Sequence, residues 1–231
     1  MVARFPRSAS WFSVLCLATL LVNGCATTAA PQAANAAPIH YALTYVAVGA
    51  SDAYGVGTDA PAYQSWPSVL AGQLSANTHL VNLGIPGATV AEAQRTEVPI
   101  AVTTHPNVIT VWLALNDYAA QVPLATYRAQ LSALLTTLAA TGARVFVGNM
   151  PDLTLLPYFA ERAQTQLHAD VSTWNDAIES VIAATGTHLV DIHADFAELA
   201  THPEYLSNDG LHPSTEGAQR LAAYFATAIH P

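Results

Sequence analysis

The sequence predicts an α/β fold in which a parallel sheet of about five strands lies between two layers of helices. From Tyr41 onward, short apolar runs rich in β-branched residues alternate with longer segments of helical periodicity. Most of the short runs are continuously apolar, which is typical of strands that are covered by helices on both faces. The chain has 231 residues, so we expect one folded domain, residues 41–231.

The individual elements follow from these patterns. The expected strands are Leu43–Val48, His79–Leu83, Val108–Leu113, Arg144–Gly148 and His188–Ile192. The expected helices are Gln64–Ala76, Leu124–Ala140, Glu161–Ala184 and Thr215–His230. Parallel strands end at a common edge of the sheet, where α/β proteins bind their ligands, so we expect the site residues directly after strands.

The first residues are typical of an export signal. Arg4 and Arg7 precede an apolar run that is too short to span a membrane comfortably, and Asn23-Gly24-Cys25 follows. This ending resembles a bacterial lipobox, in which the cysteine becomes the acylated N-terminus. We therefore expect a signal peptide over residues 1–24, lipidation of Cys25 and a flexible tether over residues 25–40. The alternative is an ordinary secretory signal that is cut after Cys25.

These features predict an exported, monomeric protein. A lipid anchor on Cys25 would hold it on the extracytoplasmic side of a membrane, at the cell surface or in the periplasm. Without that anchor, the protein would be secreted.

The charge composition excludes several classes of function. The chain has no lysine, and its 7 arginines stand against 16 acidic residues, for a net charge of −9. Such an acidic surface repels phosphate backbones, so nucleic acid is not an expected partner. The absence of lysine also excludes a Schiff-base mechanism and a P-loop lysine. We expect neither an organic cofactor nor a metal.

One segment offers an alternative to the expectation of no metal. Asp191, His193 and Asp195 alternate at the end of an expected strand, where they could present metal ligands to one side. Aspartates at such positions more commonly cap the following helix, and we favour that interpretation.

Four polar segments occupy the places where a site is expected. Three follow strands and the fourth precedes the last helix, and they are Gly49–Gly57, Asn82–Thr89, Ala114–Asp117 and Asn208–Pro213. A serine flanked by glycines after a buried strand can stand on a tight turn with its hydroxyl exposed. Together the segments predict a site for nucleophilic catalysis.

This set resembles the SGNH hydrolase family, which is named after a serine, a glycine, an asparagine and a histidine in four successive blocks. The resemblance implies a flavodoxin-like αβα fold and assigns the nucleophile to Ser51 and the Asp-x-x-His pair to Asp209 and His212. It assigns the oxyanion hole to Ser51, Gly84 and Asn116. The chain departs from the usual Gly-Asp-Ser-Leu block, because Ala50 precedes the serine and Asp52 follows it.

The chemistry implied by the resemblance is hydrolysis of a carboxylic ester through an acyl-enzyme. His212 would act as the base for Ser51, and Asp209 would orient its imidazole. The substrate would be a small-molecule, lipid or glycan ester. Two alternatives stay open: transfer of the acyl group to another hydroxyl, and a non-catalytic lipoprotein that binds glycans or lipids on the same scaffold.

Overall fold

The computed structural model describes residues 41–230 of the chain. The expected signal peptide, the lipidation site Cys25 and the tether lie outside these described residues. Between residues 41 and 230, no helix is both long and apolar enough to cross a membrane.

The centre of the fold is a five-stranded sheet in which every neighbouring pair is parallel. Its strands lie in the order β2-β1-β3-β4-β5, the flavodoxin-like order of a doubly wound sheet. Their bounds are β1 Leu43–Gly49, β2 Thr78–Asn82, β3 Val108–Trp112, β4 Arg144–Gly148 and β5 His188–Val190. The predicted fold class is thus confirmed, and each observed strand overlaps a predicted one.

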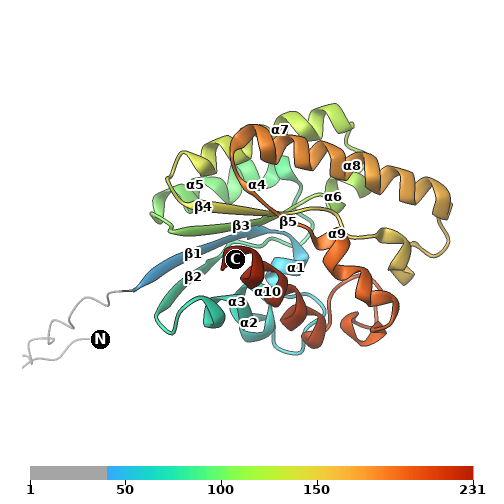
Figure 1. Cartoon of the computed structure of the whole chain (residues 1–231), viewed down its shortest axis with the longest axis horizontal. Coiled ribbons are helices and arrows are strands. Elements are labelled where there is room, and N and C mark those ends of the chain that lie inside the picture. Colours follow the sequence, from blue (N-terminus) through green and yellow to red (C-terminus); the bar gives the residue numbers. More distant parts are fainter. Residues whose placement is uncertain (1–40, 231) are drawn as a thin grey trace, which may run out of the picture. The chain divides into compact units, whose positions relative to one another are not determined.

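Helices cover both faces of the sheet (Figure 1). One layer holds α4 Val90–Thr96, α5 Val98–Thr103, α7 Leu124–Ala139 and α8 Gln164–Thr185. The other holds α1 Ser51–Tyr54, α2 Pro61–Gln64, α3 Trp66–Leu74 and α10 Thr215–Ile229. Shorter elements connect the layers at the carboxyl edge of the sheet: α6 Leu115–Ala119, α9 Ile192–Asp195, and the 3-10 turns Leu153–Leu155, Pro157–Phe159, Phe196–Ala200 and Pro203–Tyr205.

Two parts of the helical layers differ from the sequence prediction. The helix expected from Gln64 begins instead at Trp66, because Ser65 is extended (φ −57°, ψ 146°) and Pro67 lies in the first turn, where proline is tolerated. The pair α4 and α5 was not predicted, although Thr89 and Glu92 form a capping box, which is a recognisable helix start. The short length of these two helices hides their periodicity.

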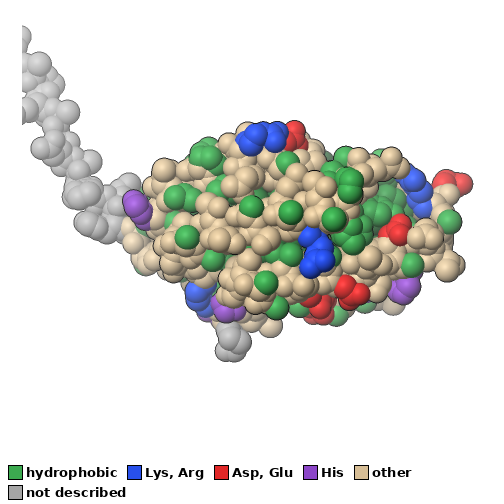
Figure 2. Space-filling view, turned by 90° about the horizontal axis from the view of Figure 1, so that it is seen from above, with side chains coloured by type: hydrophobic (Ala, Val, Ile, Leu, Met, Phe, Trp, Pro, Cys, Tyr) green, Lys and Arg blue, Asp and Glu red, His purple; other side chains and the backbone are tan. Residues whose placement is uncertain are grey.

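The layer of α3 and α10 is held to the sheet by aromatic packing. Trp66 stacks on Phe225 with ring centroids 4.3 Å apart, and both side chains are fully buried. Trp66 also meets the edge of Trp112 at the end of β3. On the face shown in Figure 2, charged side chains are few. The buried ring of Trp66 therefore joins α3 to α10 and to the end of β3.

We expect Phe225→Ala to lower the free energy of unfolding by about 3 to 5 kcal/mol, because it leaves a cavity against the Trp66 ring. Urea denaturation measures this loss. The matched control is Tyr63→Ala, since Tyr63 is 82% exposed and its removal should change stability by less than about 0.5 kcal/mol. Equal effects of the two substitutions would contradict this account of the core.

Candidate active site

Ser51 stands on a tight turn between β1 and α1. The turn leaves little space, because a Cβ on Gly49 would lie 2.7 Å from the Ala53 Cβ. As the first residue of a helix, Ser51 has a backbone N–H with no partner inside that helix. The strand therefore delivers the hydroxyl and a free N–H group to the same place.

His212 lies on a short closed loop before α10. The ends of this loop form an isolated antiparallel bridge between Leu206 and Pro213, and the Ser207 N–H donates to the His212 carbonyl over 2.8 Å. Gly57 passes so close that a Cβ there would lie 2.4 Å from the Pro213 carbonyl oxygen. Backbone contacts from two directions thus fix the position of the imidazole.

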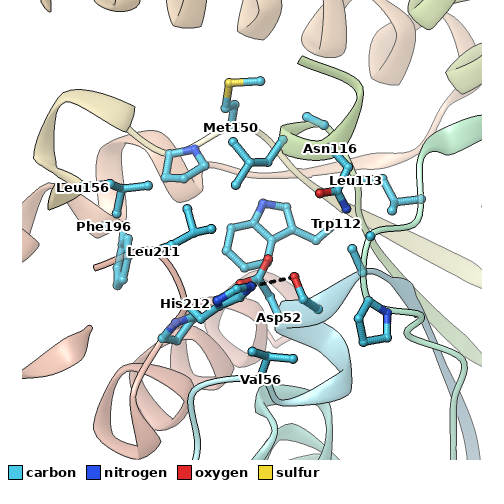
Figure 3. Close-up of a pocket in the computed structure, with 18 residues that line it drawn as sticks. Asp52, Val56, Trp112, Leu113, Asn116, Met150, Leu156, Phe196, Leu211 and His212 are labelled. Carbon is cyan, nitrogen blue, oxygen red and sulfur yellow. Dashed lines mark hydrogen bonds between the residues drawn. The ribbon is translucent and has the colours of Figure 1, made fainter. Parts of the chain in front are cut away.

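The Ser51, His212 and Asp209 side chains form a continuous hydrogen-bonded chain, and Figure 3 shows the bond from His212 to the serine hydroxyl as a dashed line. His212 Nε2 lies 2.9 Å from Ser51 Oγ, and His212 Nδ1 lies 2.6 Å from Asp209 Oδ2. These three predicted residues are therefore brought together from two distant segments of the chain.

The environment of Asp209 favours its charged form. Burial tends to raise the pKa of Asp209, but the hydrogen bond to the His212 ring and the bonds donated to Oδ1 outweigh it and hold the pKa well below its usual range. The donors to Oδ1 are the N–H groups of His212 and Leu211 and the Ser207 hydroxyl. A carboxylate that stays ionised can orient the imidazole and stabilise its positive charge.

Asn116 and its neighbour Asp117 connect α6 to the segment before α4. Asn116 Nδ2 donates to the Ala88 carbonyl over 2.9 Å, and Asp117 Oδ2 accepts from the Val90 N–H over 3.0 Å. An amide nitrogen carries two hydrogens, so Asn116 keeps one for a ligand. Burial raises the pKa of Asp117 to about 6, against the opposing effect of the Val90 N–H.

The structure places Gly84 outside the catalytic cavity. Its N–H donates to Asn82 Oδ1 over 3.1 Å, and a Cβ there would lie 2.6 Å from the Tyr54 nitrogen, so glycine is needed for packing against α1. The prediction that the Gly84 N–H faces the reacting group is therefore corrected.

Gly87, three residues later in the same loop, is placed differently from Gly84. It lines the same cavity as Ser51 and Asn116. Ile85–Ala88 is a turn closed by a 3.0 Å bond from the Ala88 N–H to the Ile85 carbonyl, with Gly87 at φ +83° as a type II turn requires. Within residues 41–230, neither the Gly87 nor the Ser51 N–H donates a hydrogen bond. Sequence reasoning did not consider Gly87, although the Pro86-Gly87 dipeptide is typical of a type II turn.

The cavity in front of Ser51 has a volume of about 340 Å³. Its walls are mainly apolar and come from several loops at the carboxyl edge of the sheet, with main contributions from Val56, Trp112, Met150, Pro151, Leu156, Phe196 and Leu211. Sequence reasoning did not identify these residues, since their approach depends on loop paths. The cavity can hold a small organic group beside the Ser51 hydroxyl.

The segment with Asp191, His193 and Asp195, which was considered as a metal site, has a structural role instead. Asp191 Oδ1 accepts from the Ala194 N–H and from Asn149 Nδ2, so Asp191 caps α9. In the part of the chain that the structure describes, no three His, Cys, Asp or Glu side chains come together as a metal site.

A buried carboxyl group supports the strand that carries Ser51. Glu97, between α4 and α5, is 1% exposed, and its Oε2 accepts from the Gly49 N–H over 2.9 Å. Within the described residues, its Oε1 is buried without a partner. Burial raises the pKa of Glu97 to about 7, although the Gly49 N–H acts in the opposite direction.

Comparison with known proteins identifies the family of this chain. Residues 47–220 match the model of the GDSL-like lipase/acylhydrolase family, which is most of the chain. The chain belongs to this family. It is accordingly a carboxylic ester hydrolase.

Individual relatives are more distant. An arylesterase from Vibrio mimicus is 24% identical over 77% of this chain and 84% of its own length. A lipase/acylhydrolase structure from Enterococcus faecalis shares the fold with a TM-score of 0.66 at 20% identity, covering 81% of this chain and 95% of the other. An acetylxylan esterase structure from Geobacillus stearothermophilus shares the fold with a TM-score of 0.66 at 18% identity, covering 83% of this chain and 96% of the other.

For this GDSL-family hydrolase, we expect Glu97 to make stability depend on pH. Its pKa is raised on folding, so its contribution is fully present below about pH 4.5 and is lost as the pH rises through about 7. The loss amounts to roughly 3 kcal/mol. Glu97→Gln keeps an acceptor for the Gly49 N–H but cannot ionise, so the variant should lose less stability than the wild type between pH 5 and pH 8.

Urea denaturation of both proteins at each pH measures this difference. Glu161→Gln, at an exposed position, is the matched control and should follow the wild type. Parallel curves for Glu97→Gln and the wild type would show that Glu97 does not titrate in this range.

Proposed function

We propose that this protein hydrolyses carboxylic esters through an acyl-enzyme on Ser51, with His212 as the base. The observation that carries this proposal is the unbroken chain from Asp209 through His212 to Ser51, which ends in a cavity with unengaged N–H donors. A serine hydroxyl is a weak nucleophile at neutral pH, and such a chain activates it.

In the first step, Ser51 Oγ attacks the ester carbonyl and its proton passes to His212 Nε2. The imidazole becomes positively charged, and the adjacent Asp209 carboxylate stabilises that charge. His212 then gives the proton to the departing alcohol. The acyl group stays on Ser51 as an ester.

Negative charge collects on the carbonyl oxygen during the attack. We assign its donors to the N–H groups of Ser51 and Gly87 and to the remaining amide hydrogen of Asn116. The loss of one such donor typically costs about 3 to 4 kcal/mol of transition-state stabilisation. The bond from Asn116 to the Ala88 carbonyl would orient this amide before substrate arrives.

Water releases the acyl group in the second step, again with His212 as base. An added alcohol can take the place of water, so the same site also serves acyl transfer, and product analysis with an alcohol acceptor distinguishes the two reactions. A purely binding role is less consistent with a 2.9 Å contact between Ser51 Oγ and His212 Nε2, which ligand binding alone does not require.

We further propose that the enzyme is an exported lipoprotein. The support is the sequence of residues 1–25, which ends in Asn23-Gly24-Cys25. In a bacterial host, the full chain should fractionate with membranes, whereas Cys25→Ser should release it into the soluble exported fraction. Identical fractionation of both would contradict the anchor.

Ser51→Ala should reduce turnover of p-nitrophenyl butyrate to the background rate, because among residues 41–230 no other hydroxyl is paired with the His212 ring. Covalent labelling by a fluorophosphonate should disappear in parallel. Ser172→Ala, at an exposed serine on α8, is the control and should keep both signals. Full turnover by a folded Ser51→Ala variant would rule out the proposed nucleophile.

Asn116→Ala should lower kcat about 100- to 1000-fold with a smaller change in KM, since its amide acts mainly in the transition state. Asn116→Asp tests the same point, because a carboxylate cannot donate to an oxyanion. Thermal unfolding of each variant separates this effect from loss of the Ala88 contact. A kcat within threefold of the wild type in stable variants would remove Asn116 from the mechanism.

A further inference from the structure

Asp52 is a carboxyl group at the catalytic centre that the proposed mechanism does not use. It follows Ser51 directly on α1, is partly buried and lines the same cavity as Ser51 and His212. Figure 3 draws it beside the His212 ring. Any substrate that reaches Ser51 therefore passes close to this carboxyl group.

The protein takes up little of the polar capacity of Asp52, whose carboxylate accepts a hydrogen bond from its own backbone N–H. Among residues 41–230, no other residue donates a hydrogen bond to its carboxylate. His212 has no ring nitrogen to spare, because Nδ1 faces Asp209 and Nε2 faces Ser51. The carboxylate is left to interact with a ligand.

Asp52 also dominates the electrostatics of the cavity walls. Of the described residues that line the cavity, it alone carries a carboxylate and none is an arginine. Burial raises the pKa of Asp52 to about 6, with an opposing effect of His212, so the group is largely ionised at pH 8. A negative charge in mainly apolar surroundings interacts strongly with charges on a ligand.

Two aromatic side chains share the cavity with this charge. Trp112 is fixed by the bond from its Nε1 to the Asn149 carbonyl, and Phe196 lies among the apolar walls. Aromatic rings next to a carboxylate favour binding of ammonium groups. A quaternary ammonium group suits such a site best, because it has no N–H group that needs a hydrogen-bond acceptor.

We propose that Asp52 selects substrates by charge, so that the site prefers esters bearing an ammonium group over neutral esters of the same shape and disfavours esters bearing a carboxylate. This rests on the proposed ester hydrolysis and adds the substrate class. Asp52 acts on the substrate by charge and takes no proton in the reaction.

The test compares substrates that differ only in charge. For the acyl side, the pair is the p-nitrophenyl ester of γ-trimethylammoniobutyrate and the isostere in which carbon replaces nitrogen. For the alcohol side, it is butyrylthiocholine and the corresponding carbon isostere. The p-nitrophenyl monoester of glutaric acid supplies the anionic arm. The measured quantity is the ratio of kcat/KM within each pair at pH 8, which cancels any common effect of Asp52 on His212.

For the wild type, we expect the cationic member of at least one pair to be favoured roughly tenfold or more. Asp52→Asn should bring that ratio close to one and raise the relative rate on the anionic ester. Glu161→Gln removes a distant exposed charge and should leave all ratios unchanged. Circular dichroism and labelling of Ser51 by a neutral fluorophosphonate verify that the Asp52→Asn site is intact, and Asp52→Leu gives a second uncharged variant.

The charge preference would be overturned if, in Asp52→Asn and Asp52→Leu, the kcat/KM ratios of both pairs stay within twofold of the wild-type ratios. The proposed ester hydrolysis would not be affected by that result. The same holds if the variants lose activity equally on charged and neutral esters, because Asp52 would then act only through His212. If the wild type hydrolyses no ester and Ser51 is not labelled, the proposed function itself fails, and the charge preference fails with it.

Discussion

The hydrogen bond between Ser51 Oγ and His212 Nε2 joins residues that are 161 positions apart, and the rest of the site depends on it. Each partner is positioned separately: Ser51 by the end of β1, and His212 by a loop whose backbone is bridged to itself and packed against Gly57. The sheet makes the meeting possible, because parallel strands deliver their following loops to one edge. The aromatic stack of α3 against α10 holds together the helix that follows the serine segment and the helix that follows the histidine loop.

Four carboxyl groups near this edge show how surroundings decide the charge of one functional group. Asp209 receives four hydrogen bonds and is held as an anion. Glu97 and Asp117 each receive one bond from the backbone N–H of another residue and are otherwise buried, so burial favours their neutral forms. Asp52 receives none from other described residues and faces the cavity. The same carboxyl group therefore serves as an orienting anion in Asp209, as a structural support in Glu97 and Asp117, and as a group that faces the cavity in Asp52.

Much of this arrangement could be predicted from the sequence. Continuous apolar runs located all five strands, since buried parallel strands have a simple signature, and the long helices were found from the helical periodicity of their apolar residues. The serine, asparagine, aspartate and histidine were found because each directly follows a strand or precedes the last helix. Position relative to the sheet indicated the four segments, and the resemblance to the SGNH family assigned the individual residues.

Other features depend on three-dimensional detail that no short pattern contains. Two glycines occur in one loop, and only their backbone environment shows that Gly84 packs against α1 while Gly87 lines the cavity. The supporting role of Glu97 was hidden as well, because its contact with Gly49 spans 48 positions of sequence. The cavity walls come from loops whose paths are set by packing.

The division between walls and catalytic groups has a consequence for how such enzymes diversify. Met150, Leu156 and Phe196 shape the cavity but make no hydrogen bond to the serine, the imidazole or its carboxylate. Substitutions there can remodel the space offered to a substrate while the reacting atoms keep their spacing. Evolution can thus explore new substrates on this scaffold in single steps, without passing through inactive ancestors.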